Sequence, residues 1–202
     1  MRRRGWKQWI RNRRLWGLGL ALSALLLVVL PPGISQGWWA YRKYSVAQWN
    51  ELIAEHAAAT GLDPDLVRAV VLCESSGDRY AMSPANASGL MQITPITHRE
   101  AQRRFGLPEG DLFDPEHNLS VGTAYLAYLL ERFDGDERLA IAAYHMGPTS
   151  VAKHVRKHPD LDSEELIAKT AGPKTRAYVE RVLKEYAIYQ EASAALLAQD
   201  AP

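Results

Sequence analysis

Hydrophobic residues recur at helical spacing in the stretch between residues 62 and 77. The apolar positions are Leu66, Val67, Val70, Val71 and Cys73. Asp63 is the expected N-cap, Pro64 follows it at the first helical position, and Ser75-Ser76-Gly77 ends the pattern. The sequence therefore predicts a helix between these signals, with Glu74 in its last turn, on or beside the buried face.

The same periodicity predicts further helices along the chain. Their expected ranges are Ser45 to Thr60, Thr94-Pro95 to Phe105, Asp114-Pro115 to Phe133, Leu139 to Tyr144, Val151 to Val155, and a last helix from Pro173 into the Ala-rich tail. Ser45 is the expected cap of the first of these helices, and Gly61 is its stop. Because no alternating pattern of useful length indicates a β-strand, the predicted fold class is all-α.

A nearly continuous apolar run extends from Leu15 to Leu30, and with the residues up to Ile34 it is long enough to cross a bilayer core. Basic residues precede it, and by the positive-inside rule they would stay in the cytoplasm. The expected organisation is a basic cytoplasmic segment (1–14), a transmembrane signal anchor (15–34), a linker (35–44), a helical domain (45–191) and a tail (192–202). A cleaved secretory signal is the alternative, and both interpretations place the domain beyond the inner membrane.

Charge is distributed unevenly along the chain. The formal net charge is +1, but residues 1–44 hold nine basic residues and no acidic ones, which leaves 15 Lys and Arg against 23 Asp and Glu in the remainder. An acidic domain argues against nucleic acid as a partner. The single cysteine, Cys73, excludes an intramolecular disulfide and is expected to be a buried, inert thiol.

Histidines offer little alternative chemistry. His154 and His158 are four residues apart, but the glutamate that a zinc-protease helix places after its first histidine is Val155 here. His98 and His117 stand apart in the sequence and are expected to be surface or capping residues. We therefore expect no metal and no cofactor.

Glu74 is the candidate acid. A carboxyl near the negative end of a helix and partly removed from water holds its proton closer to neutral pH, which is the property a general acid needs. The alternative is a solvated glutamate at a helix end. Asp78, four residues later, is expected to form a turn rather than to act as a second catalyst.

Four motifs between residues 60 and 185 occur in the order of a known family. They are Glu74-Ser75 with Ser83-Pro84-Ala85 and Gly89-Leu90-Met91-Gln92; Phe113-Asp114-Pro115 with Asn118 and Gly122; Ala143-Tyr144-His145-Met146-Gly147; and Thr175-Arg176-Ala177-Tyr178-Val179. Together they resemble the lytic transglycosylases of the soluble-transglycosylase type, which have a goose-lysozyme-like catalytic domain that cleaves peptidoglycan. The resemblance implies that residues 45–191 form such a domain.

The resemblance also implies a mechanism. Glu74 would protonate the glycosidic oxygen between N-acetylmuramic acid and N-acetylglucosamine, and its carboxylate would then accept the proton of the muramoyl C6 hydroxyl, so that a 1,6-anhydro ring forms without water. The implied substrate-binding or supporting residues are Ser75, Gly89, Met91, Gln92, Tyr144, His145 and Tyr178. Tyr178 is expected to hydrogen-bond Glu74, while Ser75 and Gln92 would orient the acid or the N-acetyl group.

The implied partners are the glycan strands of peptidoglycan and, through the N-terminal segment, the membrane. The implied location is the inner membrane, with a single pass and the catalytic domain in the periplasm or another extracytoplasmic space. The sequence indicates no particular protein partner. Two alternatives to the transglycosylase remain: an inactive, membrane-anchored protein that binds glycan as a cell-wall scaffold, and a hydrolytic muramidase.

Three residues depart from the family's pattern. His145 stands where the family usually has Asn, Asn86 where it usually has Gly, and Lys174 where Glu is common before Thr175. Asn86 is expected to keep the left-handed backbone that glycine often supplies. His145 is the larger change, because a side chain expected to contact sugar has changed in size and can carry a charge.

Overall fold

The computed structural model describes residues 40–199, so the predicted cytoplasmic segment (1–14) and anchor (15–34) lie outside the described residues. The chain divides into two units between Arg42 and Lys43, and the second unit contains the helices α2 to α9. Within residues 40–199, none of the helices combines the length and the apolar content that a membrane span requires.

The second unit is built from helices. Their bounds are α2 Asn50–Thr60, α3 Pro64–Glu74, α4 Pro95–Phe105, α5 Pro115–Arg132, α6 Glu137–Met146, α7 Pro148–Lys157, α8 Ser163–Thr170 and α9 Pro173–Gln199. Extended pairing in the described part of the chain is limited to isolated bridges from Ser88 to Met82 and to Ile93. The predicted all-α fold class is therefore confirmed.

Polar caps start the central helices where the sequence predicted. Three side chains each accept a hydrogen bond from the first turn and precede a proline: Asp63, Thr94 and Asp114. The prediction for α2 was wrong at its start, because Ser45 belongs to an earlier helical stretch and a turn at Gln48 and Trp49 separates that stretch from Asn50. Helix α8, which Asp162 caps, was not predicted.

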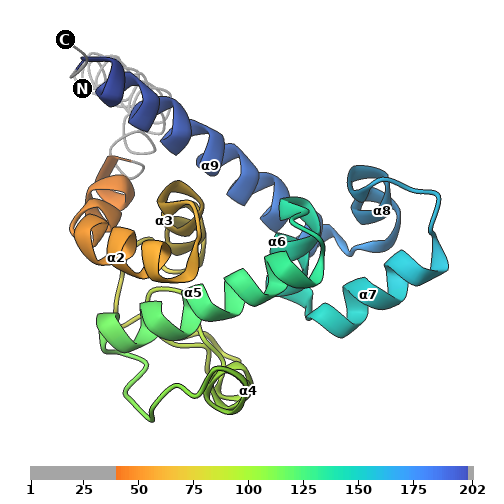
Figure 1. Ribbon diagram of the computed structural model, residues 1–202, viewed down its shortest axis with the longest axis horizontal. Helices are drawn as coiled ribbons and strands as arrows, with labels where there is room; N and C mark the ends of the chain where they lie inside the picture. The colour runs from red at the N-terminus through yellow and green to blue at the C-terminus, as the bar shows by residue number, and fades with distance from the viewer. Residues whose placement is uncertain (1–39, 200–202) are drawn as a thin grey trace, which may run out of the picture. The chain divides into compact units, whose positions relative to one another are not determined.

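Helix α3 forms the centre of the domain. Its buried apolar residues are Leu66, Val67, Ala69, Val70, Val71 and Leu72. Helix α2 packs against α3 on one side, and α9 packs against it on another (Figure 1). Hydrogen bonds join the start of α3 to the middle of α9 and the end of α3 to the first turns of α9, so the two helices run antiparallel.

Helix α6 connects the two sides of the domain. Its middle residues, 140–143, are three alanines and Ile141, all buried, and these small side chains permit close packing against α5 and α9. Helices α7 and α8 lie on the side of α6 away from α2 (Figure 1). The C-terminal end of α6 is thereby held beside the start of α9.

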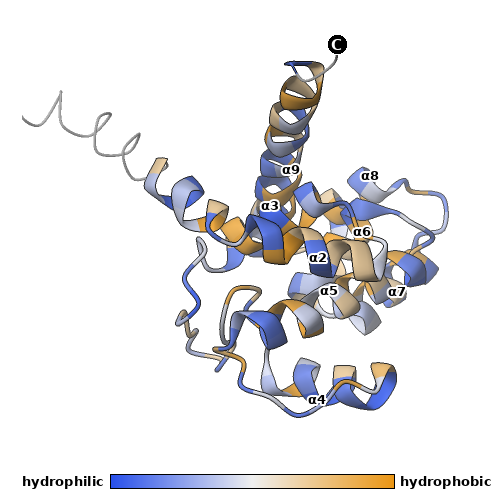
Figure 2. Cartoon of the chain, turned by 60° about the vertical axis from the view of Figure 1, so that its left-hand side comes forward, coloured by the Kyte–Doolittle hydropathy of each residue, from blue (hydrophilic) through white to orange (hydrophobic). Residues whose placement is uncertain are grey.

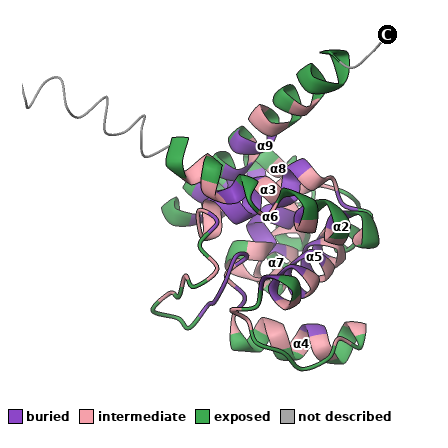
Figure 3. Ribbon diagram, turned by 90° about the vertical axis from the view of Figure 1, so that its left-hand side faces the viewer, coloured by how far each residue is buried: buried purple, intermediate pink, exposed green. Residues whose placement is uncertain are grey.

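Two elements lie at the periphery. Helix α4 packs on α5 and buries one of its residues, Ala101 (Figure 3). His98 Nε2 on α4 lies 2.8 Å from His117 Nε2 on α5, so these histidines do not stand apart as expected. The last turns of α9 are largely exposed and carry the hydrophobic residues Leu196 and Leu197 (Figure 2). Residues 192–199 of the predicted tail therefore continue α9.

Candidate active site

Glu74 ends α3 and faces α9. Tyr178 on α9 donates a hydrogen bond of 2.6 Å from its hydroxyl to Glu74 Oε1, so the bond expected from the sequence is present. Tyr178 is 3% exposed, whereas Glu74 is half-buried. The carboxyl therefore lies at the boundary between the core and the solvent, with its tyrosine partner on the core side.

Burial raises the pKa of Glu74 to about 7. The hydrogen bond from Tyr178 and the positive charge of Arg181 act in the opposite direction but do not outweigh the burial. A carboxyl with this pKa populates both of its protonation states near neutral pH, so it can release a proton and take one back. Arg181 was not predicted from the sequence, although it lies one turn after Tyr178 on the same face of α9.

Tyr144 ties α6 to the loop that follows α3. Its hydroxyl donates a hydrogen bond of 2.8 Å to the backbone oxygen of Met91. Burial, followed by the charge of Glu74, raises the pKa of Tyr144 well above its usual value. The Met91 side chain is 0% exposed and lies so close to Gly122 that a Cβ there would be 2.3 Å from its sulfur. Met91 is therefore a core residue: its side chain packs against α5, and its backbone oxygen binds Tyr144.

Ser75 and Asp78 shape the turn that follows α3. The Ser75 hydroxyl donates to the backbone oxygen of Val71 at 3.2 Å and accepts from the backbone N–H of Gly77 at 3.1 Å. Asp78 is exposed, and its carboxylate accepts a hydrogen bond of 2.9 Å from the backbone N–H of Tyr80. Asp78 is thus the turn-forming residue that the sequence predicted.

Gln92 links distant parts of the same loop through hydrogen bonds from its side chain. Its side-chain Nε2 donates to the backbone oxygens of Ala81 at 3.0 Å and Gly89 at 3.1 Å. The backbone of Gln92 is left-handed, with φ of 49°, and Asn86 has φ of 57°. The expectation that Asn86 keeps the left-handed conformation of the usual glycine is confirmed. Gln92 acts on the shape of the loop through these two bonds.

Gly89 is required by close packing against α5. Its φ is 77°, and a Cβ there would lie 2.2 Å from the backbone oxygen of Leu112 and 2.3 Å from Asn118 Nδ2. Asn118 is 0% exposed, and its amide makes hydrogen bonds of 2.8 to 2.9 Å to three backbone groups: Met91 N–H, Ser88 O and Leu112 O. Asn118 was not predicted as a site residue, although an asparagine on the apolar face of α5 was a signal for it.

His145, the departure from the family's asparagine, contacts the site. Its ring centroid lies 4.7 Å from that of Tyr178, at an interplanar angle of 32°. Its Nδ1 is 3.1 Å from Thr175 Oγ1. His145 is an exposed residue, but the partial burial of its ring and the charges of Arg181 and Lys174 lower the pKa of His145 below its usual value.

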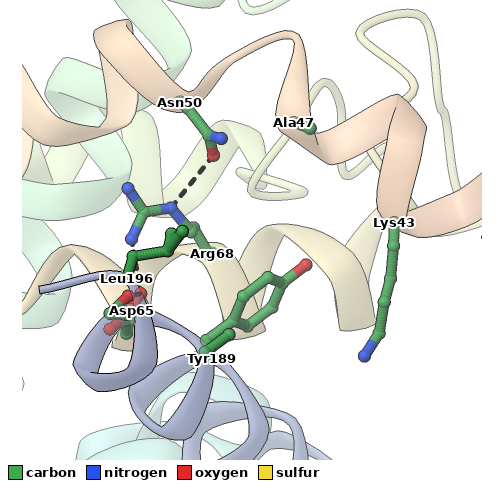
Figure 4. Close-up of a pocket in the computed structure, with 9 residues that line it drawn as sticks. Lys43, Ala47, Asn50, Asp65, Arg68, Tyr189 and Leu196 are labelled. Carbon is green, nitrogen blue, oxygen red and sulfur yellow. Dashed lines mark hydrogen bonds and ion pairs between the residues drawn. The ribbon is translucent and has the colours of Figure 1, made fainter. Parts of the chain in front are cut away.

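A separate cavity of about 220 Å³ lies near the start of α3 (Figure 4). It is lined by Lys43, Ala47, Asn50, Asp65, Arg68, Tyr189, Ala192, Ser193 and Leu196. Arg68 donates a hydrogen bond of 3.0 Å to Asn50 Oδ1 and pairs with Asp65, so much of the polar lining is internally paired. Glu74, at the opposite end of α3, does not line this cavity.

The fold and the site together define an all-α, lysozyme-like domain with one glutamate that can exchange a proton near neutral pH. Residues 51–167 match the family described as the Transglycosylase SLT domain, and the chain belongs to this family.

The soluble lytic murein transglycosylase of Escherichia coli is 31% identical over 147 residues, which cover 70% of this chain and 23% of that protein. The membrane-bound lytic murein transglycosylase E of Buchnera aphidicola is 30% identical over 180 residues, covering 76% of this chain and 81% of that protein. The X-ray structure of an inactive mutant of the lytic transglycosylase Slt from Pseudomonas aeruginosa matches with a TM-score of 0.67 and 32% identity, over 72% of this chain and 24% of that one. This chain thus spans less than a quarter of the length of the Escherichia coli and Pseudomonas aeruginosa relatives.

Proposed function

We propose that the chain is a lytic transglycosylase that cleaves the β-1,4 bond between N-acetylmuramic acid and N-acetylglucosamine in peptidoglycan and leaves 1,6-anhydromuramic acid ends. The observation that carries the proposal is Glu74, a half-buried carboxyl with a pKa of about 7 and a hydrogen bond from Tyr178. Membership of the family supports the substrate, because the relatives described above are murein transglycosylases.

In the first step Glu74 gives its proton to the glycosidic oxygen, and the bond from this oxygen to C1 of the muramoyl residue breaks. The leaving N-acetylglucosamine keeps the proton as its 4-hydroxyl. In the second step the Glu74 carboxylate takes the proton of the C6 hydroxyl while O6 forms a bond to C1. The proton returns to Glu74, and no water is consumed. A pKa near the ambient pH suits both steps.

The supporting residues act on the acid or on the loop beside it. The Tyr178 hydroxyl stabilises the Glu74 carboxylate that exists between the two steps. Tyr144 holds the loop onto α6 through the backbone of Met91. Ser75, Gly89 and Gln92 fix the course of the loop, which then forms one wall of the glycan-binding surface.

Asp78 bears on the choice between a transglycosylase and a muramidase. A retaining glycosidase needs a second carboxylate about 5 Å from the first as its nucleophile, and an inverting one needs a carboxylate farther away to activate water. Asp78 is the acid closest to Glu74 in the sequence, but it is exposed and bound to the backbone of Tyr80. This favours an intramolecular nucleophile from the sugar itself.

The deciding experiment is mass spectrometry of the fragments that the full chain, purified in detergent, releases from peptidoglycan. We expect anhydromuramoyl ends from the wild-type chain and from the Asp78→Asn control, and none from Glu74→Gln. Reducing ends that disappear with Glu74→Gln would identify a muramidase. If no variant released fragments but all sedimented with the glycan, the chain would be a binding protein.

The placement of this domain at the membrane is part of the proposal. The apolar run at residues 15–34 would anchor the chain in the inner membrane, with residues 1–14 in the cytoplasm, residues 35–44 as the linker and the catalytic domain (45–191) on the outer side. Extraction of membranes at alkaline pH should leave the chain in the pellet, and protease added to spheroplasts should digest the domain. A released chain that begins after residue 30 would instead identify a cleaved signal.

A further inference from the structure

His145 contacts the acid's tyrosine partner but takes no part in the two chemical steps. It lies in the last turn of α6, where this helix meets the start of α9 (Figure 1). The imidazole ring stacks against Tyr178, and its Nδ1 is within hydrogen-bond distance of Thr175 Oγ1. Thr175 and Tyr178 are three residues apart on α9 and share a face, so both contacts join the imidazole to the same side of this helix.

The contact between the rings of His145 and Tyr178 allows the charge of His145 to affect Glu74, because the Tyr178 hydroxyl is bonded to that carboxylate. The Tyr178 hydroxyl is bonded to Glu74 Oε1 at 2.6 Å, so any change in the donor strength of this hydroxyl alters the proton affinity of the carboxylate. A positive charge against an aromatic face draws electron density from the ring. A charged imidazole would therefore make the phenol a stronger donor and the carboxylate a weaker base.

We propose that His145 is a positioning residue that sets the proton affinity of Glu74 through Tyr178, and that its neutral form is the one that supports turnover. The inference rests on the proposed function of Glu74 as acid and then base. A protonated His145 would stabilise the Glu74 carboxylate, which would then take the C6 hydroxyl proton more slowly.

Partial burial and the charged groups around His145 favour its neutral form. Arg181 and Lys174, both on α9, face it, and no acidic group in the described part of the chain offsets them. Partial burial of the ring and these two charges lower the pKa of His145 below its ordinary value of 6.5, so the ring gains its charge at a lower pH than a free histidine does. Glu74, at the end of α3, is bonded to the hydroxyl of Tyr178.

The consequence is a pH profile with two limbs that belong to different residues. Turnover falls at high pH as Glu74 loses the proton that it must donate, and it falls at low pH as His145 gains one. His145→Gln removes the second ionisation, so the acid limb should move to lower pH while the basic limb stays. His154→Gln is the matched control, because its imidazole lies on α7 and, among the described residues, no hydrogen bond or ring contact joins it to Glu74 or Tyr178.

A direct titration tests the coupling without any turnover. Carbon-13 NMR of labelled glutamate would follow Glu74 in His145→Arg, a permanent cation that stacks on aromatic rings, and in His145→Gln, which is neutral. We expect the titration midpoint to be about half a unit lower in the arginine variant, a roughly threefold change in proton affinity. The difference should disappear when both variants also carry Tyr178→Phe.

Equal midpoints in the arginine and glutamine variants would overturn the inference, and so would a difference that survives Tyr178→Phe. An acid limb that stays at the same pH in His145→Gln as in the wild-type chain would overturn it as well. If the chain released no anhydromuramoyl products, the proposed function would fail, but the NMR titration would still decide whether His145 acts on Glu74.

Discussion

Tyr186 donates a hydrogen bond of 2.8 Å to Asp63 at the start of α3, and it is the counterpart of the bond from Tyr178 to Glu74 at the end of that helix. The pKa values of the two carboxyls nevertheless shift in opposite directions. Burial opposes ionisation of Asp63, but hydrogen bonds from the Asp65 backbone, Tyr186 and Gln190 and the charge of Arg68 together outweigh it and lower the pKa. At Glu74 burial prevails and raises the pKa. Burial, rather than the tyrosine, therefore makes Glu74 a proton donor.

The first prediction concerns the hydroxyl of Tyr178. Tyr178→Phe keeps the ring that stacks on His145 but removes the donor that stabilises the Glu74 carboxylate. The pKa of Glu74 should then rise above about 7, and turnover should fall roughly tenfold or more, because hydrogen bonds to charged groups contribute about 1.5–3 kcal/mol. The pH dependence of anhydromuramoyl release measures both effects.

Tyr186→Phe is the matched control for that experiment. It removes an equivalent bond from the same helix pair, at the end remote from Glu74. We expect it to destabilise the fold by about 1–2 kcal/mol and to leave the pH profile in place. Equal effects of the two substitutions on the profile would mean that Tyr178 acts only through the stability of the α3–α9 pair.

The second prediction is that Glu74→Gln stabilises the protein at neutral pH. The ordinary glutamate pKa is 4.5, and the folded value is about 7. Between these values the unfolded chain releases the proton and the folded one keeps it, so the wild-type stability falls as the pH rises through this window. Because glutamine has no such equilibrium, the variant should be more stable above pH 7 by on the order of 2 kcal/mol, after allowance for the partial exposure of Glu74.

Thermal melts check this prediction. A difference on the order of 2 kcal/mol should raise the Tm of Glu74→Gln by about 5 °C at pH 8 in a domain of this size. The two proteins should melt together well below pH 4.5, where the wild-type carboxyl is protonated in both states. A constant difference across the whole range would show that the pKa of Glu74 is not raised by folding.

The third prediction separates two kinds of glycine. Gly89→Ala places a methyl group against the Leu112 backbone and Asn118, and it requires alanine in the left-handed conformation. Gly106→Ala also requires left-handed alanine, but the space around its Cβ is open. We expect Gly106→Ala to destabilise by about 1 kcal/mol and Gly89→Ala by about 3 kcal/mol or more. Urea unfolding of the two variants compares them directly. Similar losses would mean that the loop shifts away from α5 without resistance.

The fourth prediction concerns the histidine pair that joins α4 to α5. Burial and the neighbouring His117 lower the pKa of His98. A histidine whose pKa is lowered by folding stabilises the protein at pH values above its ordinary pKa of 6.5. This contribution is lost as the pH falls below 6.5. Amide hydrogen exchange in α4 should therefore accelerate at pH 5.5 relative to pH 7.5, beyond the intrinsic pH effect. His98→Gln should show no such excess acceleration.

The helix starts were predictable because their signals are local. A cap such as Asp63 and the proline after it act within one turn, so the sequence alone locates the start of α3. The start of α2 was not predictable, because apolar spacing continues through the turn that Gln48 and Trp49 form. That turn is held from a distance: the Trp49 indole N–H donates to the backbone oxygen of Gly77 at 2.9 Å.

The site was predictable only where a motif supplied the long-range information. Glu74 and Tyr178 are 104 residues apart, and the resemblance, not the spacing, paired them. The hydrogen bond between His98 and His117 spans 19 residues and belongs to no motif, so it was missed. Asn118 was seen in a motif but not given a role, because its three partners are backbone groups and these leave no trace in the sequence.

The amide of Asn118 also bears on how the loop after α3 can change during evolution or design. Residues 75–94 contain no helix, and the backbone hydrogen bonds of Ser88 and Met91 and the close approach of Gly89 to α5 meet in this one side chain. The outer part of the loop, around residues 78–87, is exposed over much of its length and is free of that constraint. A segment grafted there from a relative should keep its own specificity, provided that Gly89 and Asn118 are transferred as a pair.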